Sequence, residues 1–208
     1  MSTTSLFVGA LLAEILPVLR KVEHPTILSP RLVQGQWNGH NIIVLRCSVG
    51  PKSAYYNTMH ALKLCQVDQI ISLGTCGALS DHLAIGTVCT SDSIQSESGA
   101  QATIKALPDL PVETLITVHK PVFSPERRDF FSTRATICEM EAFSVWKAAN
   151  GIPFHTLKVV SDHAGRDPDP AMSPSRIKAH RIALFMLRAG LLSRQFLVPA
   201  INTLYPNR

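Results

Sequence analysis

Short apolar runs alternate along this chain with longer segments of helical periodicity. The run Ser5–Gly9 leads into a helical pattern over Leu11–Lys21, and Gln69–Leu73 is another short run of the buried type. Short apolar runs bounded by turn residues predict buried strands, whereas spacings of three and four residues predict amphipathic helices. The alternation of the two predicts an α/β fold, in which helices connect the strands of a sheet.

Turn residues give the first half of the chain more detail. Leu32–Trp37 and Asn41–Cys47 flank Asn38-Gly39, and both of these residues tolerate positive φ, so a hairpin is predicted here. Gly50-Pro51 predicts the start of a helix that runs to about Cys65, because proline suits the first helical position.

The second half continues the alternation, with one polar interruption. Ser91–Glu113 is rich in Ser and Gln and broken by two prolines, which predicts a surface loop. With no repeat and no composition break, we expect a single domain over residues 1–208, built on a central mixed, twisted sheet flanked by helices. The remaining predicted elements are strands at Thr87–Thr90, Thr114–Val118, Ala135–Cys138 and Phe154–Val160, and helices at Glu139–Asn150 and Pro174–Arg194.

Composition supports a compact globular protein, because 46% of the residues are hydrophobic and 17% are charged. The formal charge of +5 first suggests a nucleic-acid partner. The basic residues, however, are scattered singly or in pairs such as Arg127-Arg128, without aromatic residues between them to stack on bases. We therefore expect no nucleic-acid partner.

The cysteines and the N-terminus bear on location. The five cysteines are an odd number without a C-x-x-C pair, which predicts free thiols in a reducing compartment and no disulfide framework. The apolar stretch Leu6–Leu19 lacks a basic start and a cleavage site, and Glu14 interrupts it, so neither a signal peptide nor a membrane span is predicted. We expect a cytoplasmic protein without a membrane partner.

Candidate chemistry follows four of the predicted strands. In a mostly parallel sheet, the loops after the strands gather at the carboxyl edge, where ligands bind. Glycines in such loops let a ligand approach the backbone, although they also serve simply to turn the chain. The segments are Gly9-Ala10 with Glu14 beyond, Ser48-Val49-Gly50, Gly74-Thr75-Cys76-Gly77-Ala78 and Ser161-Asp162.

Two acidic motifs are candidates for binding a sugar and for protonating a heterocycle attached to it. Glu139-Met140-Glu141 places two carboxylates where a strand turns into a helix, and a carboxylate can accept two ribose hydroxyls at once. Asp162, if partly desolvated, could donate a proton to a departing heterocycle. The alternatives are an acidic helix start for the first group and a helix cap at Ser161-Asp162 for the second.

Together these motifs resemble the nucleoside phosphorylase superfamily, and within it the 5′-methylthioadenosine/S-adenosylhomocysteine nucleosidases. The resemblance covers nearly the whole chain, with the motifs in the same order. It implies that Glu14 activates the attacking water and that Thr75 contacts this water or a phosphate. It also implies that Met140 and Glu141 bind the ribose.

The resemblance implies roles at the base as well. Asp162 matches the acid that protonates the purine, Ser161 holds that acid, and Phe123 matches an aromatic residue that stacks on the base. Gly77 belongs to the glycine turn beside the ligand. Lys158 stands where the nucleosidases have an arginine, so it keeps the charge and loses the planar fork. No cofactor and no metal are implied.

The residues favour water over phosphate as the nucleophile. Phosphorylases of this superfamily carry arginines in the first loop and before the Gly-Ser/Thr turn, where this chain has Glu14 and Ser72-Leu73. Arg46 is the nearby arginine that could still serve.

The predicted function is therefore hydrolysis of a 5′-substituted purine nucleoside of the methylthioadenosine, adenosylhomocysteine, futalosine or adenosyl-hopane type. A phosphorylase and a non-catalytic nucleoside-binding protein are the alternatives. The segments Ser91–Glu113 and 124–138 are shorter than in the nucleosidases, which predicts a more open 5′ side. A homo-oligomer, specifically a dimer, is expected from the resemblance.

Overall fold

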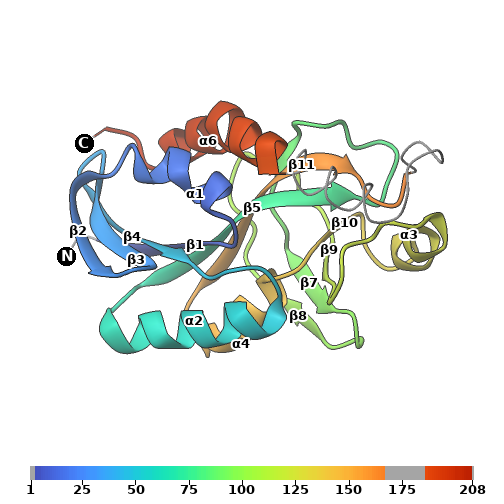
Figure 1. Cartoon of the computed structure of the whole chain (residues 1–208), viewed down its shortest axis with the longest axis horizontal. Coiled ribbons are helices and arrows are strands. Elements are labelled where there is room, and N and C mark those ends of the chain that lie inside the picture. The colour runs from blue at the N-terminus through green and yellow to red at the C-terminus, as the bar shows by residue number, and fades with distance from the viewer. Residues whose placement is uncertain (1–2, 167–185, 208) are drawn as a thin grey trace.

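A mixed sheet forms the centre of the computed structural model, which describes residues 3–166 and 186–207 (Figure 1). The order of its main path is β2-β3-β4-β1-β5-β10-β9-β7-β8, and β11 pairs with both β5 and β6. The strands are β1 (Thr4–Gly9), β2 (Glu23–Ser29), β3 (Leu32–Trp37), β4 (His40–Arg46), β5 (Gln69–Ala78), β6 (Val88–Cys89), β7 (Ser93–Ser96), β8 (Gln101–Thr103), β9 (Leu115–Thr117), β10 (Ile137–Glu139) and β11 (Phe154–His163).

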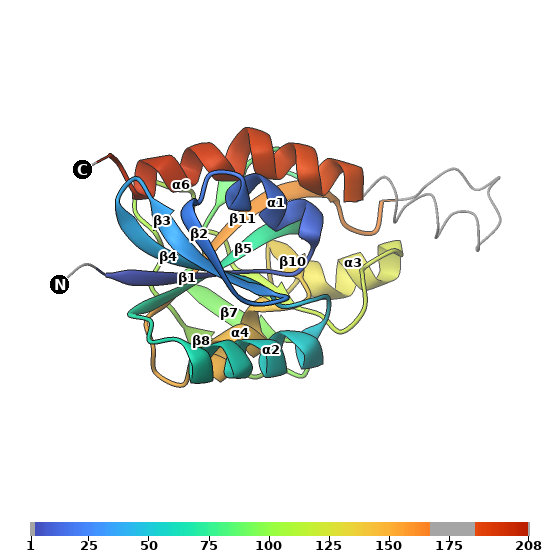
Figure 2. The same cartoon turned by 60° about the vertical axis from the view of Figure 1, so that its left-hand side comes forward.

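Helices cover both faces of this sheet (Figures 1 and 2). One face carries α1 (Leu12–Leu19) and a C-terminal helix made of residues 186–192, the π-helical turn Ser193–Leu197 and α6 (Val198–Leu204). The other face carries α2 (Pro51–Leu64) and α4 (Ala142–Ala149), which pack side by side. A further helix, α3 (Pro125–Ser132), lies at one end of the molecule. The predicted fold class, α/β with a mixed central sheet, is confirmed.

Strand β1 shows how the alternation of side chains builds the two halves of the core. Phe7 packs in the cluster under α1 and the C-terminal helix, and its neighbours Leu6 and Val8 pack in the cluster under α2 and α4. Successive side chains of a strand point to opposite faces, so a strand that is apolar throughout has to be covered on both sides. The apolar run that was predicted to be a buried strand therefore packs against helices on both faces of the sheet.

Several local predictions are confirmed. β3 and β4 form the predicted antiparallel hairpin, with Asn38 and Gly39 at φ of 51° and 76°. Pro51 begins α2, and α4 ends at Asn150 in the left-handed conformation.

Two glycine- and serine-containing segments predicted as loops are instead continuous strand. Gly74–Ala78 lies within β5, which pairs with β11 along its length and with β10 near its end. Ser161-Asp162 lies within β11, where the register shifts by one residue between Val160 and Asp162. Partner strands on both sides extend these two strands past the residues that would otherwise turn the chain.

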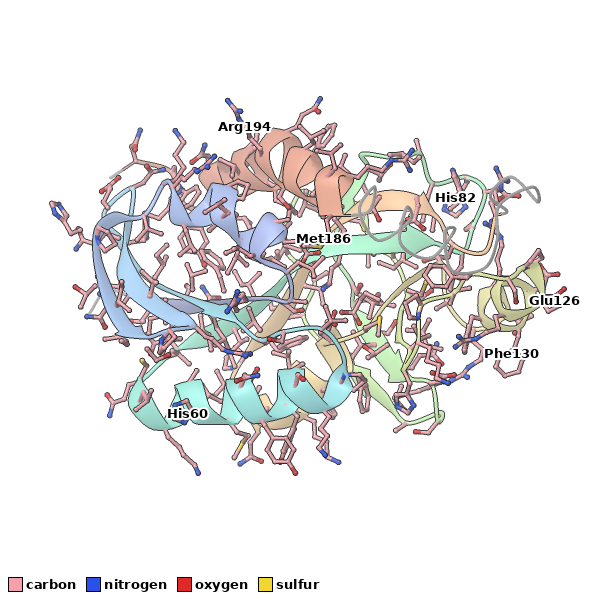
Figure 3. The ribbon with its side chains drawn as sticks, in the orientation of Figure 1. His60, His82, Glu126, Phe130, Met186 and Arg194 are labelled. Atoms are coloured by element: carbon pink, nitrogen blue, oxygen red, sulfur yellow. The ribbon has the colours of Figure 1, made fainter. Side chains whose placement is uncertain are left out.

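Other segments also differ from the sequence prediction. Ser91–Glu113 is not a loop throughout, because β7 pairs with β9 and β8 pairs with β7. Strand β2 and helix α3 were not predicted, and the C-terminal helix continues past Arg194, which is labelled in Figure 3, to Leu204. Of the predicted helix Pro174–Arg194, residues 174–185 lie outside the described residues.

The state of the cysteines and the apolar character of the helices are the last two features of the fold. All five cysteines are free, and four of them are buried. Among the helices within residues 3–166 and 186–207, none has both the length and the apolar character that a membrane span requires.

Candidate active site

Glu14 is a buried carboxylate in the first turn of α1, held by three donors. One oxygen, Oε1, accepts hydrogen bonds from the backbone N–H and the hydroxyl of Thr75, both at 2.8 Å, and Oε2 accepts one from the N–H of Leu11 at 2.9 Å. Gly74 makes room for it, because a Cβ there would lie 2.8 Å from Oε1. The structure thus joins two predicted site residues, Glu14 and Thr75, in one contact.

Glu139 and Glu141 stand at the start of α4 but make different contacts. Glu139 is buried, and its carboxylate accepts from the N–H groups of Glu141 and Ala142 and from the hydroxyl of Thr117 at 2.6 Å. Glu141 is only partly buried, and its Oε1 accepts from the N–H of Gly50 at 2.7 Å. Glu139 therefore caps the helix, which leaves Glu141 as the carboxylate of this pair that can serve a ligand.

The surroundings of Glu141 disfavour its charge. Burial, and after it the nearby carboxylate of Glu139, raise the pKa of Glu141 to about 8, although the N–H of Gly50 and the ammonium of Lys158 act in the opposite direction. The charged form of Glu141 is thus costly to the folded chain, and carboxyl groups with such raised pKa values cluster at functional sites.

Replacing Glu141 with glutamine should accordingly stabilise the folded chain at high pH. The folded pKa lies above the unfolded value near 4.5, so the stability of the wild type falls as pH rises from about 4.5 to 8 and stays low above that. We expect the variant to gain on the order of 1–3 kcal/mol relative to wild type at pH 9 and little at pH 5. Denaturant unfolding at pH 5, 7 and 9 measures this, with Glu23→Gln on exposed β2 as control. A difference that is the same at all three pH values would contradict it.

Asp162 is positioned by its neighbour and by the irregular pairing of β11. Ser161 donates its hydroxyl to Oδ2 of Asp162 at 2.6 Å and lies 3.1 Å from the carbonyl oxygen of Cys76. The extra residue at Ser161 brings Asp162 opposite Gly77, where a Cβ would lie 3.3 Å from Oδ1. Ser161, Asp162 and Gly77, all predicted site residues, therefore lie together.

Asp162 and Glu14 contact the same strand, β5, at different residues. Thr75 contacts Glu14 and Gly77 faces Asp162, and these two β5 residues are roughly 7 Å apart, two strand residues along one face.

The remaining predicted residues surround this pair. Phe123 is 45% exposed, and the N–H of Gly165 binds the adjacent carbonyl of Val122, so Phe123 lies beside the chain that leaves Asp162. Met140 is half-buried and packs against the apolar cluster at this end of the sheet. Lys158 is buried and bonds to Glu139 and Ser72.

Sequence reasoning missed several contributors. Thr117 donates its hydroxyl to Glu139 and Ser72 accepts from the ammonium of Lys158, and no local pattern distinguished either residue. The N–H of Gly50, in a segment that the sequence did indicate, donates to Glu141. Arg31 also escaped notice; its guanidinium donates to the hydroxyl of Ser48, in the loop after β4. Arg46, the arginine considered from the sequence, is half-buried at the end of β4, opposite Gly9. Within the described residues, no cluster of His, Cys, Asp and Glu side chains is suited to a metal ion.

Comparisons with known proteins identify relatives of this chain. The family model described as phosphorylase superfamily matches residues 6–112. Among curated proteins, a 5′-methylthioadenosine/S-adenosylhomocysteine nucleosidase of Shewanella halifaxensis is 25% identical over 86% of this chain and 95% of its own length. The corresponding protein of Shewanella loihica is 26% identical over 84% and 92%.

Solved structures show the same fold. A 5′-methylthioadenosine/S-adenosylhomocysteine nucleosidase of Helicobacter pylori matches with a TM-score of 0.77 and 18% identity, covering 98% of this chain and 99% of that one. The futalosine hydrolase of Helicobacter pylori matches with a TM-score of 0.77 and 19% identity over 98% and 99% of the two chains.

Proposed function

The chain belongs to the phosphorylase superfamily, and within that family we propose that it is a nucleosidase, which hydrolyses the N-glycosidic bond of a 5′-substituted purine nucleoside. One observation carries the proposal. Glu14 contacts Thr75 and Asp162 lies against Gly77 on the same strand, and Glu141, the proposed acceptor of the ribose hydroxyls, stands at the start of α4. The curated relatives named above are nucleosidases, which supports the same activity.

The proposed reaction assigns a separate task to each carboxyl group. Cleavage of the bond leaves positive charge on the sugar and negative charge on the base. Asp162 donates its proton to the departing purine, with Ser161 fixing its orientation. Glu14 accepts a proton from the attacking water, Thr75 holds Glu14 in place, and Glu141 receives the 2′- and 3′-hydroxyls of the ribose.

The surroundings of Glu14 support water as the nucleophile. A phosphate dianion beside a carboxylate would be repelled, and a phosphate site needs fork-like donors. The guanidinium of Arg31, which could supply such donors, donates instead to the hydroxyl of Ser48. Phosphorolysis is the second candidate, because Arg31 and Arg46 both lie near the ends of β1 and β4.

An assay with and without inorganic phosphate separates the two candidates. Purified protein is incubated with methylthioadenosine, adenosylhomocysteine, futalosine and inosine, and free base and sugar product are measured. We expect base release at the same rate with and without phosphate, together with a free reducing sugar. Release only with phosphate, as a sugar 1-phosphate, would show a phosphorylase. Binding without release from any of the four would show a non-catalytic nucleoside-binding protein.

The proposal also covers the cellular compartment and the oligomeric state of the protein. Free cysteines suit a reducing cytoplasm, and we propose that the enzyme acts there as a homodimer. Light scattering of the purified protein measures the oligomeric state; a monomeric mass at assay concentration would contradict the dimer.

A further inference from the structure

Lys158 is a buried cation in the middle of β11, four residues before Asp162. Its ammonium lies 3.1 Å from the hydroxyl of Ser72 and 3.2 Å from Oε2 of Glu139, and only 3% of the side chain of Lys158 or of Glu139 is exposed. An ammonium group has three donors, and these contacts direct two of them away from a ligand.

The partner of Lys158 fixes the start of α4. Besides Lys158, Glu139 accepts from the N–H groups of Glu141 and Ala142, and its contact Thr117 accepts in turn from the N–H of Phe143. These bonds satisfy N–H groups that a helix start leaves without partners. The backbone position of Glu141 therefore depends on Glu139, and Glu139 is held by Lys158.

Charge in this cluster is unbalanced. The groups that act on Glu141 are the carboxylates of Glu139 and Glu14, the N–H of Gly50 and the ammonium of Lys158. Two carboxylates oppose ionisation of Glu141, and Lys158 is the cation among these groups that favours it. Removing Lys158 would leave three carboxyl groups together without that cation, and buried charges without a counterion are strongly disfavoured.

We propose that Lys158 is a positioning residue and not a ligand of the substrate: through Glu139 it holds the first turn of α4 and favours the ionised form of Glu141, and it thereby sets the pH range over which the ribose diol binds. The inference rests on the proposed function, because it takes Glu141 as the acceptor of the 2′- and 3′-hydroxyls.

The expected signature is a pH-dependent affinity. An ionised carboxylate accepts two hydroxyl donors, whereas a protonated one uses part of its capacity as a donor. With the pKa of Glu141 raised to about 8 in the free protein, affinity for a diol should fall as pH drops below that value, by up to tenfold per pH unit. Binding in this range should release a proton.

A charge cycle tests the proposal. The ligand is a purine C-nucleoside, whose carbon–carbon bond to the ribose cannot be hydrolysed, and its Kd is measured by calorimetry from pH 6 to 9.5. Lys158→Met should move the midpoint of the affinity profile up by about one pH unit, and Glu139→Gln should move it down by a similar amount. The double variant should return close to wild type, and Lys158→Arg should keep the wild-type midpoint.

The double variant also addresses folding, because replacing a buried ion pair by two uncharged side chains is far milder than leaving one charge alone. If Lys158→Met does not fold, Glu139→Gln, Lys158→Arg and the double variant still decide the question. Midpoints that coincide in all folded variants, with affinity merely reduced, would overturn the inference while leaving the proposed function intact. A wild type that neither binds the C-nucleoside nor cleaves any nucleoside would overturn both.

Discussion

Asp162→Asn should lower kcat on purine nucleosides by about 10²–10⁴-fold and leave KM nearly unchanged, because the lost group acts on the leaving base and not on the bound sugar. Asparagine has the same shape and can still accept the hydroxyl of Ser161, so the fold around β11 should persist. Steady-state kinetics with the best purine substrate of the wild type provide the measurement.

A substrate with a different leaving group makes this prediction specific. The leaving group of a p-nitrophenyl riboside is a stable phenolate that needs no proton. Asp162→Asn should therefore cleave this substrate at close to the wild-type rate. Ser161→Ala is the matched control, with a smaller loss on purines, since it removes the group that orients the acid. Equal losses on both substrates would show that Asp162 serves the structure and not the leaving group.

Glu14→Gln should reduce kcat by a similar factor, about 10²–10⁴, for a different reason. The amide cannot accept a proton from water, although its oxygen can still accept from Thr75. The loss should therefore appear equally with the purine and with the p-nitrophenyl riboside, which distinguishes this variant from Asp162→Asn in the same pair of assays.

Small anions give a second test of Glu14. Removing the carboxylate also removes the charge that repels anionic nucleophiles, so added azide should restore part of the rate in Glu14→Gln and produce a ribosyl azide. Glu113→Gln, at a distance in sequence and in the polar segment before β9, is the control. A Glu14→Gln variant that retains nearly the full rate without azide would contradict the assignment of Glu14 as the base.

Much of the candidate site could be predicted from the sequence, because its residues follow strands that are recognisable as apolar runs. Glu14, Thr75, Glu141 and Asp162 were all expected near one edge of the sheet, and the structure joins Glu14 to Thr75 directly. The different contacts of Glu139 and Glu141 could not be predicted. They depend on Thr117 and Lys158, which lie 22 and 19 residues from Glu139 in the chain and reach it only through strand pairing.

The errors in the fold prediction have physical causes of the same kind. β7 and β8 are short and polar, so their local preference for strand conformation is weak. The pairing of β7 with β9 and of β8 with β7 outweighs that weakness. β2 contains Pro25, which argues against a strand, but β2 is the edge strand where a missing N–H is tolerated. The signal for α3 was present, since Ser124 caps its first turn and Pro125 begins it.

The extra residue in β11 has a consequence for how this chain can vary in length. Regular pairing would set Ser161 against Gly77 and turn Asp162 to the opposite face of the sheet, away from Thr75. Deleting Ser161 would restore regular pairing with Asp162 still opposite Gly77, but it would remove the hydroxyl that holds the carboxylate of Asp162. Connections such as the one between β8 and β9 can gain or lose residues freely by comparison. The extra residue is thus what allows Ser161 and Asp162, neighbours in the sequence, to serve the site together.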